Sequence, residues 1–317
     1  MTRSADPVPL QAASELLDIL CEPGTLGPLE LVGRELVTPQ GKRFSISPNG
    51  IPCFTETHAS PEALRQQEHY DRVSEAYLAN LEYPHSIEIA KRIDAALLAS
   101  VEQPIETLVE LCCGRGEALR LPLTFGRWIG VDVSLSMLEA GLRARPRQAS
   151  WFIQGDATAL PLRSGCCDAV FMLGGIHHVN DRARLYSEVA RILRPGGRLY
   201  WREPVNDFLP WRLARALIYR VSPALDAETE RPLRRGEEAP ILASAGLQLE
   251  RWQTIGFAAW ALFMNSDVLV VNRALRFVPG IGRWVKAGAL LDEAILRLPG
   301  ARGWGAQVIG VARKPAV

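Results

Sequence analysis

From residue 107 onward, short apolar runs alternate with amphipathic stretches. The apolar runs predict strands at residues 107–112, 127–132, 151–154, 167–173, 198–202, 247–255 and 306–312. The stretches between them predict helices that begin at Gly116 and extend over 134–145 and 181–193. Regular alternation of this kind is typical of a parallel sheet covered by helices on both faces. We therefore expect an α/β fold built on a doubly wound, mostly parallel sheet of seven strands.

The pattern before residue 61 is different and predicts a smaller unit. Its expected elements are short, a helix over 15–20 and strands over 29–32 and 35–37. Gly50-Ile51-Pro52 closes this unit, and the polar segment 55–61 reads as a linker. We expect a β-rich domain over residues 1–60 and a larger domain over residues 61–317.

Two insertions interrupt the alternation, at about residues 205–232 and 257–302. Both are rich in apolar and aromatic side chains, and the second is mostly helical in pattern. Together they predict a lid over a substrate pocket. Because the lid is apolar, we expect a hydrophobic substrate. An arginine-rich amphipathic helix over 210–221 could instead form a homodimer interface or lie on a membrane surface.

Charge and composition narrow the class of partner. The chain of 317 residues carries 36 basic and 35 acidic side chains, and a net charge of +1 disfavours nucleic acid as a partner. The six cysteines have no Cys-Xaa-Xaa-Cys spacing, so reduced thiols are favoured and no metal site is expected. No signal-peptide pattern and no apolar run of about 18 residues is found, so we expect a soluble cytoplasmic protein.

Acidic residues at the predicted strand ends are candidates for binding a ligand, because ligands bind at the carboxyl ends of parallel strands. Glu110 and Asp132 end the first and second strands, and Asp156 follows the third. A carboxylate at Asp132 can accept both hydroxyls of a ribose, and Asp156 can accept an adenine amine. Glu110 lies near the turn Gly114-Arg115-Gly116, where it can order that loop or meet a ligand ammonium group.

Four motifs follow one another in the larger domain. They are Val109-Glu110-Leu111-Cys112-Cys113-Gly114-Arg115-Gly116, Gly130-Val131-Asp132-Val133-Ser134-Leu135-Ser136-Met137-Leu138, Gly155-Asp156-Ala157 and Arg194-Pro195-Gly196-Gly197. In this order they resemble the motifs of class I S-adenosylmethionine-dependent methyltransferases, closest to the quinone-biosynthesis and natural-product enzymes. The resemblance covers roughly residues 70–203. It implies a Rossmann-like fold and S-adenosylmethionine as the cofactor.

The resemblance also implies a set of cofactor-binding residues. These are Gly114 and Gly116 for the methionine moiety, Asp132 for the ribose, Val133 and Met137 for the adenine faces, Asp156 for the adenine amine, Tyr70 and Tyr77 on a helix folded over the cofactor, and Glu110, Ala157 and Gly174 around them. Cys112 departs from the family pattern, because it stands where the family turn has its first glycine. Glycine permits unusual dihedral angles and close ligand approach, so we expect Cys112 to narrow the pocket slightly while cofactor binding survives.

The N-terminal unit resembles the small zinc-ribbon proteins that partner or precede RNA methyltransferases. The resemblance rests on Leu16-Leu17-Asp18-Ile19-Leu20, Gly27-Pro28-Leu29 and Asn49-Gly50-Ile51-Pro52. The first metal knuckle would fall at Glu22 and Thr25, and neither is a cysteine. We expect a degenerate docking module in place of a metal site.

Four side chains are candidates for catalysis. His177 and His178 follow the fourth strand, and a histidine is a plausible base for a phenol or enol acceptor, although either could only pack behind the cofactor loop. Glu203, after the fifth strand, could face the acceptor or cap a loop. Tyr77 could lie near the sulfonium or be a core residue of its helix.

The expected function is methyl transfer from S-adenosylmethionine to an oxygen or carbon of a hydrophobic small molecule, such as a secondary metabolite, quinone or lipid precursor. The first alternative is an RNA base methyltransferase, since some of these carry an N-terminal zinc ribbon. The second is a methyltransferase-like binding protein without catalysis, which Cys112 and the degenerate N-terminal unit motivate.

Overall fold

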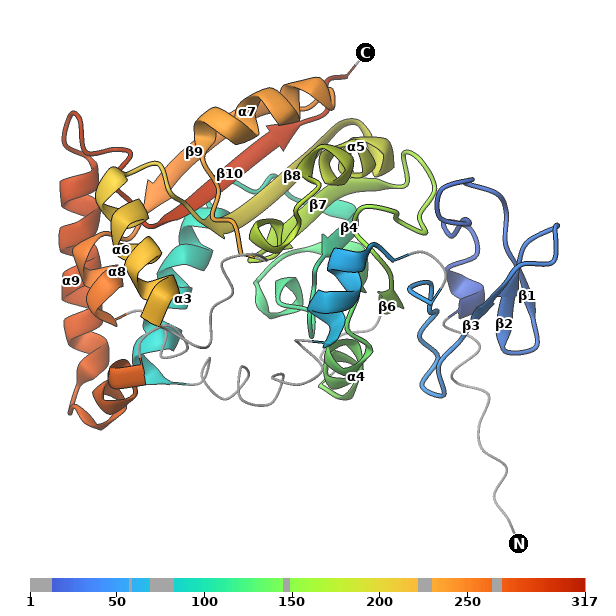
Figure 1. Cartoon of the computed structure of the whole chain (residues 1–317), viewed down its shortest axis with the longest axis horizontal. Coiled ribbons are helices and arrows are strands. Elements are labelled where there is room, and N and C mark those ends of the chain that lie inside the picture. Colours follow the sequence, from blue (N-terminus) through green and yellow to red (C-terminus); the bar gives the residue numbers. More distant parts are fainter. Residues whose placement is uncertain are drawn as a thin grey trace, which may run out of the picture.

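The computed structural model describes residues 13–56, 59–68, 83–144, 149–221, 230–263 and 270–316. Its main feature is a seven-stranded sheet with the order β6-β5-β4-β7-β8-β10-β9 (Figure 1). The strands are β4 (Ile105–Leu111), β5 (Phe125–Asp132), β6 (Ser150–Gln154), β7 (Cys167–Leu173), β8 (Leu193–Pro204), β9 (Gln248–Ile255) and β10 (Gln307–Arg313). The five strands from β4 through β8 pair with their neighbours in parallel, and β10 pairs antiparallel with β8 and β9. The predicted α/β fold with a mostly parallel sheet is confirmed.

Helices connect and cover the strands. They are α3 (Pro84–Leu98), α4 (Leu135–Arg143), α5 (Arg182–Ile192), α6 (Leu209–Val221), α7 (Arg235–Ser244), α8 (Ala258–Phe263) and α9 (Ile281–Leu296), with the 3₁₀ segments η1 (Ala118–Arg120), η2 (Ile176–His178) and η3 (Val270–Phe277). Residues 61–68 are also helical. Ser134 caps α4 by accepting from Met137 N–H, and Asp181 caps α5 by accepting from Arg184 N–H. Both caps fall at the first residue of the predicted helices.

The helix expected to begin at Gly116 is absent from the described residues, and this prediction is wrong. Only the 3₁₀ turn η1 follows the glycine turn. The reason is Pro122, which disfavours helical dihedrals at the residue before it, and Leu121 is extended with φ −81° and ψ 147°. The loop after β4 therefore reaches β5 without a crossover helix.

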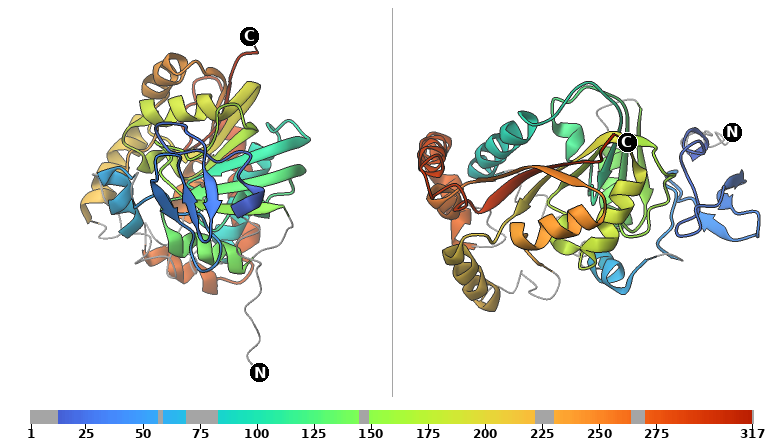
Figure 2. Two further views of the ribbon diagram at one scale, coloured as in Figure 1. Left: turned by 90° about the vertical axis from the view of Figure 1, so that its right-hand side faces the viewer. Right: turned by 90° about the horizontal axis from the view of Figure 1, so that it is seen from above.

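Both faces of the sheet are buried. Along β4, Val109 and Leu111 belong to one core and Leu108 to the other, because successive strand residues point to opposite faces. Tyr186 of α5 covers the first face and Leu97 of α3 the second. Seen from above in Figure 2, α3 and α7 lie on opposite sides of the sheet.

The N-terminal unit is a small antiparallel sheet. Its strands are β1 (Glu30–Val32), β2 (Glu35–Val37) and β3 (Arg43–Ser45), the third of which was not predicted. The helix expected over 15–20 is also displaced, because helical residues end at Glu15 and turns follow. At the expected metal knuckle, Glu22 accepts a hydrogen bond from Thr25 and pairs with Lys42 at 3.2 Å.

This unit lies beside β6, at one edge of the large sheet (Figure 1). Cys53 forms a parallel bridge with Gln154 at the end of β6, and Leu20 forms an antiparallel bridge with Leu162. Leu16 and Phe54 are buried in the same core as the first face of the large sheet. The unit therefore shares its hydrophobic core with the larger part of the chain, and a domain boundary at residue 60 stays a prediction.

The two insertions lie at the opposite end of the sheet (Figure 1). The first contains α6, and the second contains α8, η3 and α9, so the mostly helical pattern of the second is confirmed. α9 packs against α3 and α8. The predicted lid includes residues 222–229 and 264–269, and these lie outside the described part of the chain. Among the described helices, none has the length and apolar character needed to cross a bilayer.

Candidate functional site

A cavity of about 330 Å³ lies at the carboxyl ends of β4, β5, β6 and β7, and we call it the strand-end cavity. Its walls come from the loops after these strands and from the helical segment at residues 60–66. Several predicted cofactor-binding residues line it, namely Cys112, Gly114, Asp132, Val133, Met137, Asp156, Ala157 and Gly174. The parallel topology thus brings together side chains that are far apart in sequence.

Asp132 is held by backbone N–H groups from two loops. Its Oδ2 accepts from Gly114 N–H at 2.8 Å, and its Oδ1 accepts from Ser134 N–H at 2.9 Å. Hydrogen bonds to a carboxylate favour its charged form and fix its orientation. The carboxylate therefore joins the glycine turn after β4 to the start of α4.

Asp156 is buried and is also held on both oxygens. Its Oδ1 accepts from the N–H and the hydroxyl of Thr158, at 2.7 and 2.8 Å. Its Oδ2 accepts from Ser60 N–H at 2.8 Å. Ser60 follows the N-terminal unit, so the segment that leaves this unit reaches the wall of the strand-end cavity.

The turn after β4 has an unusual backbone. Gly114 and Gly116 have φ of +53° and +88°, and the non-glycine Cys112 has φ of +51°. A Cβ atom at Gly175 would lie 2.4 Å from Cys112 Cβ, so the loops after β4 and β7 touch at this point. Burial raises the pKa of the Cys112 thiol well above its ordinary value, which keeps it neutral near pH 7.

Glu110 lies behind the strand-end cavity. Both its carboxyl oxygens accept from Ala118 N–H, at 3.0 and 3.1 Å, and Oε2 also accepts from Trp128 Nε1 at 3.1 Å. Burial raises the pKa of this carboxyl well above its usual value. Of the two roles expected for Glu110, its contacts are those of a residue that orders the loop. Gly116 also lies behind the wall, where a Cβ would meet Leu119 at 2.8 Å.

The two histidines have different surroundings. His178 lines the strand-end cavity. His177 Nδ1 lies 2.6 Å from Glu203 Oε2, and the two histidine rings are 3.9 Å apart. Fully buried Glu203 also accepts from the N–H groups of Gly175 and Ile176, both at 2.7 Å. Glu203 therefore anchors η2 and, with it, the position of both histidines.

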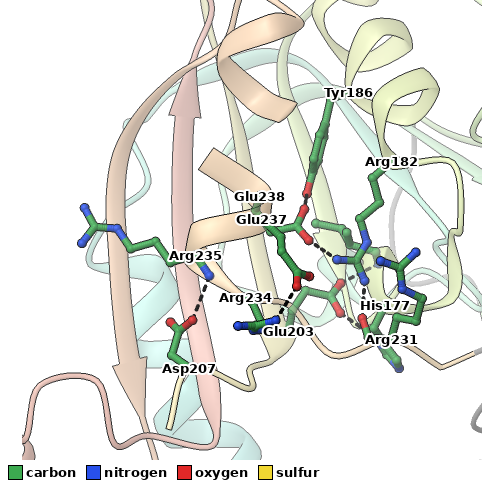
Figure 3. Close-up of polar contacts among 11 residues, drawn as sticks. His177, Arg182, Tyr186, Glu203, Asp207, Arg231, Arg234, Arg235, Glu237 and Glu238 are labelled. Carbon is green, nitrogen blue, oxygen red and sulfur yellow. Dashed lines mark hydrogen bonds and ion pairs between the residues drawn. The ribbon is translucent and has the colours of Figure 1, made fainter. Parts of the chain in front are cut away.

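A buried network continues from η2 toward α7 (Figure 3). Arg231 N–H donates to the His177 carbonyl at 2.8 Å, and the guanidinium of Arg182 donates to the Arg231 carbonyl and to Glu238. The Tyr186 hydroxyl donates to Glu238 at 2.6 Å. We call Arg182, Tyr186 and Glu238 the α5–α7 cluster.

Sequence reasoning missed the α5–α7 cluster. Charged residues on amphipathic helices usually face solvent, and no local motif marks these three as buried partners. Tyr70 and Tyr77, predicted to fold over the cofactor, lie outside the described residues.

A second cavity, of about 920 Å³, lies between α3, β9, α8 and α9, and we call it the helical cavity. Apolar side chains such as Trp260 and Phe263 line it together with long charged ones such as Lys91 and Arg92. Helix α3 lines the helical cavity and none of its residues lines the strand-end cavity. Its Asp94 pairs with Arg202 at 2.9 Å, and Arg202 lies 3.9 Å from Glu117, which lines the strand-end cavity.

Residues 109–201 match a family model described as a methyltransferase domain. A demethylmenaquinone methyltransferase of Lactococcus lactis is 34% identical over 116 residues, which are 33% of this chain and 44% of that protein. The chain spans about half the length, or less, of the curated relatives it matches most strongly.

Solved structures show the same fold. The [4+2]-cyclase SpnF is 20% identical with a TM-score of 0.58, covering 82% of this chain and 98% of that one. A chain from the complex between the Haloferax volcanii Trm112 methyltransferase activator and a methyltransferase is 22% identical with a TM-score of 0.52, covering 78% and 97%. The sheet order, the family model over residues 109–201 and the similarity to curated methyltransferases support a class I S-adenosylmethionine-dependent methyltransferase domain in this part of the chain.

Proposed function

We propose that the protein transfers a methyl group from S-adenosylmethionine to an oxygen or carbon atom of a hydrophobic small molecule. The observation that carries this proposal is the pair of carboxylates in the strand-end cavity. Asp132 and Asp156 are both fixed by backbone N–H groups, so their remaining lone pairs are aimed without further reorganisation. Two preorganised acceptors suit a ligand that offers hydroxyl and amine donors.

The residues of the cavity fit S-adenosylmethionine. Asp132 would accept from the ribose hydroxyls and Asp156 from the adenine amine, with Val133 and Met137 against the adenine faces. A Cβ at Gly114 would lie 3.1 Å from Met137 Cε, so the glycine keeps this end of the cavity open. A volume of about 330 Å³ lies within the range of small-molecule sites, roughly 300–1,000 Å³.

When bound, S-adenosylmethionine supplies an electrophilic methyl group on a sulfonium. The chain then has to orient the acceptor, exclude water and take a proton from a protic acceptor. We assign proton acceptance to His178, because its side chain lines the strand-end cavity. His177 and Glu203 act as positioning residues, since Glu203 holds His177 and the backbone of η2.

The acceptor class is supported by two observations. The curated relatives include a demethylmenaquinone methyltransferase, whose named substrate is a hydrophobic quinone precursor. The two helical insertions add apolar surface on the side of the sheet to which the carboxyl ends of β8 and β9 point. Both favour an apolar acceptor over a large polar one.

The N-terminal unit is proposed to act as an attached docking module of residues 1–60. Its support comes from the Cys53–Gln154 bridge at the sheet edge and from the Ser60 hydrogen bond to Asp156. The second contact reaches a wall of the strand-end cavity and supports a role of the unit in stabilising the cofactor site.

Calorimetry with S-adenosylmethionine tests the donor assignment. We expect the wild type to bind and Asp132→Ala to bind about 10- to 100-fold more weakly, since hydrogen bonds to a charged group contribute about 1.5–3 kcal/mol each. Asp18→Ala is the matched control, because Asp18 is exposed and its ion-pair partner among the described residues, Arg127, lies near the start of β5, at the opposite end of the strand from Asp132. Absence of binding by the wild type contradicts the donor assignments.

Transfer of a labelled methyl group to prenylated phenols and hydroquinones tests the acceptor class. Binding of structured RNA with a steep salt dependence, together with methylated RNA, would instead support the RNA alternative. Donor binding without transfer to any acceptor would support a binding protein without catalysis. Cys112 favours this second candidate, because its side chain occupies space at the loop contact with Gly175 that glycine would leave free.

A further inference from the structure

Large exposed apolar side chains gather on the outer side of α9. Phe277, Trp284, Leu290, Leu291 and Leu298 are each at least half exposed. Trp284 and Leu291 are seven residues apart, so they fall on one stripe of the helix, while Phe277 in η3 and Leu298 just beyond the helix stand at its two ends. We call these five residues the α9 face, and it lies at the end of the molecule opposite the N-terminal unit (Figure 1).

The inner side of α9 is already packed. Ile281, Val285 and Leu296 are buried, and Ile281 and Val285 share a small core with Phe263 of α8. The helix is therefore apolar on two sides, and only one side is covered within the described residues. Monomeric proteins rarely expose a contiguous apolar surface of this kind unless it binds something.

The charges around the α9 face are almost all positive. Between residues 270 and 304 there are six cationic and two acidic residues. All six cations are exposed, and three of them, Lys286, Arg297 and Arg302, line the helical cavity, which leaves Arg273, Arg276 and Arg283 for the α9 face. Asp292 is buried and accepts from three backbone N–H groups at the start of α8. Glu293 pairs with Arg92 at 3.2 Å. Both acids are thus directed away from the face.

The first insertion repeats this combination independently. Helix α6 exposes Leu209, Leu213 and Leu217 at intervals of four residues. Residues 208–221 contain three arginines and no acid, and Arg212 and Arg220 are exposed. Both views that show this end of the molecule place α6 and α9 there (Figures 1 and 2). Two insertions that are distant in sequence therefore present leucines and arginines at the same end.

We infer that the α9 face docks on an anionic lipid bilayer. Exposed leucine, phenylalanine and tryptophan side chains enter the headgroup region, while arginine and lysine side chains reach the lipid phosphates. A second copy of the chain is a poorer occupant, because a symmetric contact through this face would bring the like charges of Arg273, Arg276 and Arg283 together. Docking does not depend on methyl transfer, so it stands apart from the proposed function.

Vesicle sedimentation with the whole chain tests the inference. We expect the wild type to bind vesicles containing about one-third phosphatidylglycerol at least tenfold more strongly than pure phosphatidylcholine vesicles, as charge attraction predicts. The double variant Trp284→Gln/Leu291→Gln should bind the anionic vesicles at least tenfold more weakly, since two apolar contacts are lost. Both residues are exposed, so the variant should keep the wild-type melting temperature.

Val32→Gln is the matched control, because Val32 is equally exposed but lies on the N-terminal unit, and its binding should equal that of the wild type. Equal binding by the wild type and the double variant, or no preference for anionic vesicles, overturns the inference. Self-association in solution that the double variant abolishes, without vesicle binding, also overturns it and assigns the face to a second copy. Calorimetry with S-adenosylmethionine on the same variants separates this result from a failure of the proposed function.

Discussion

The walls of the strand-end cavity and of the helical cavity consist of different chemical groups. Carboxylates held by backbone N–H groups and glycines with positive φ form the first. The ends of long side chains on α3, α8 and α9 form much of the second, which is nearly three times larger. Backbone groups are common to any sequence with this loop geometry, whereas side chains change with single substitutions. The first cavity is therefore suited to one fixed ligand, and the second can change without disturbing the sheet.

The buried groups that hold the elements next to the two cavities also differ. Behind η2, the α5–α7 cluster buries an ion pair in which Arg182 and Glu238 are almost fully inaccessible. In the second insertion, buried Asp292 holds the start of α8 through backbone hydrogen bonds. Loss of the first should destabilise the whole fold, and loss of the second should loosen only the insertion.

The largest effect is expected for Glu238→Ala. This change leaves Arg182 buried without its carboxylate and removes the acceptor of the Tyr186 hydroxyl, so unfolding free energy should fall by about 3–5 kcal/mol. Equilibrium urea unfolding measures it. Glu237→Ala is the matched control, since Glu237 is exposed and its ion-pair partner among the described residues is Arg234, and it should cost less than about 1 kcal/mol. Equal losses in the two variants would show that the cluster has no special role.

A smaller and local effect is expected for Asp292→Ala. Three backbone N–H groups lose their acceptor, which should lower the unfolding free energy by about 1–2 kcal/mol. Amide hydrogen exchange should quicken in α8 and α9, while affinity for S-adenosylmethionine stays unchanged. A matching loss of donor affinity would contradict the independence of the two cavities, which share no lining residue.

Cys112→Gly is expected to act on the strand-end cavity alone. Glycine tolerates the positive φ at this position and removes a side chain that contacts the Gly175 loop, so S-adenosylmethionine should bind about two- to tenfold more tightly. Calorimetry measures the change. Cys113→Ala is the comparison variant, because Cys113 is adjacent but has an ordinary φ, and its gain in affinity for S-adenosylmethionine should be smaller. Unchanged or weaker binding by Cys112→Gly would mean that the thiol does not narrow the site.

The smallest effect concerns His85, at the start of α3. Its ring is buried, and neither nitrogen has a hydrogen-bond partner among the described residues. Burial lowers the pKa of His85, because the charged ring is disfavoured there. Its contribution to stability is thus complete above the unfolded pKa of about 6.5 and is lost as pH falls below that value.

We expect stability to fall by less than about 1.4 kcal/mol per pH unit between pH 6.5 and 5, the limit for one proton. Thermal melts over this range measure the slope. His85→Leu should flatten it, and an identical slope in the variant would assign the acid sensitivity to other groups.

The alternation of strands and helices was predictable because the central strands β4, β5 and β7 are largely buried and the helices α4 and α5 each carry an apolar stripe. The end of β7 and the caps at Ser134 and Asp181 agree with the sequence pattern. The helix predicted to begin at Gly116 does not form, because Pro122 disfavours a helical backbone at Leu121. β3 was missed because only one of its three residues, Phe44, is apolar, whereas β1 and β2 each have two.

The strand-end acids could be anticipated because the carboxyl ends of parallel strands share one edge. The contact of Ser60 with Asp156 could not, because 96 residues separate the two and no local pattern links them. The same holds for Glu238, which meets Tyr186 across 52 residues. Long-range polar contacts of this kind depend on how loops and helices pack, which single-residue patterns do not encode.

The hydrogen bond from Ser60 to Asp156 couples the binding of a ligand at Asp156 to the attachment of the N-terminal unit at β6. A ligand that requires Asp156 in its present orientation favours the state in which the N-terminal unit is attached to β6. By reciprocity, attachment of this unit raises the affinity for that ligand by the same factor. The N-terminal unit would then behave as a covalently tethered effector, whose occupancy of its own docking site is set by the concentration of the methyl donor.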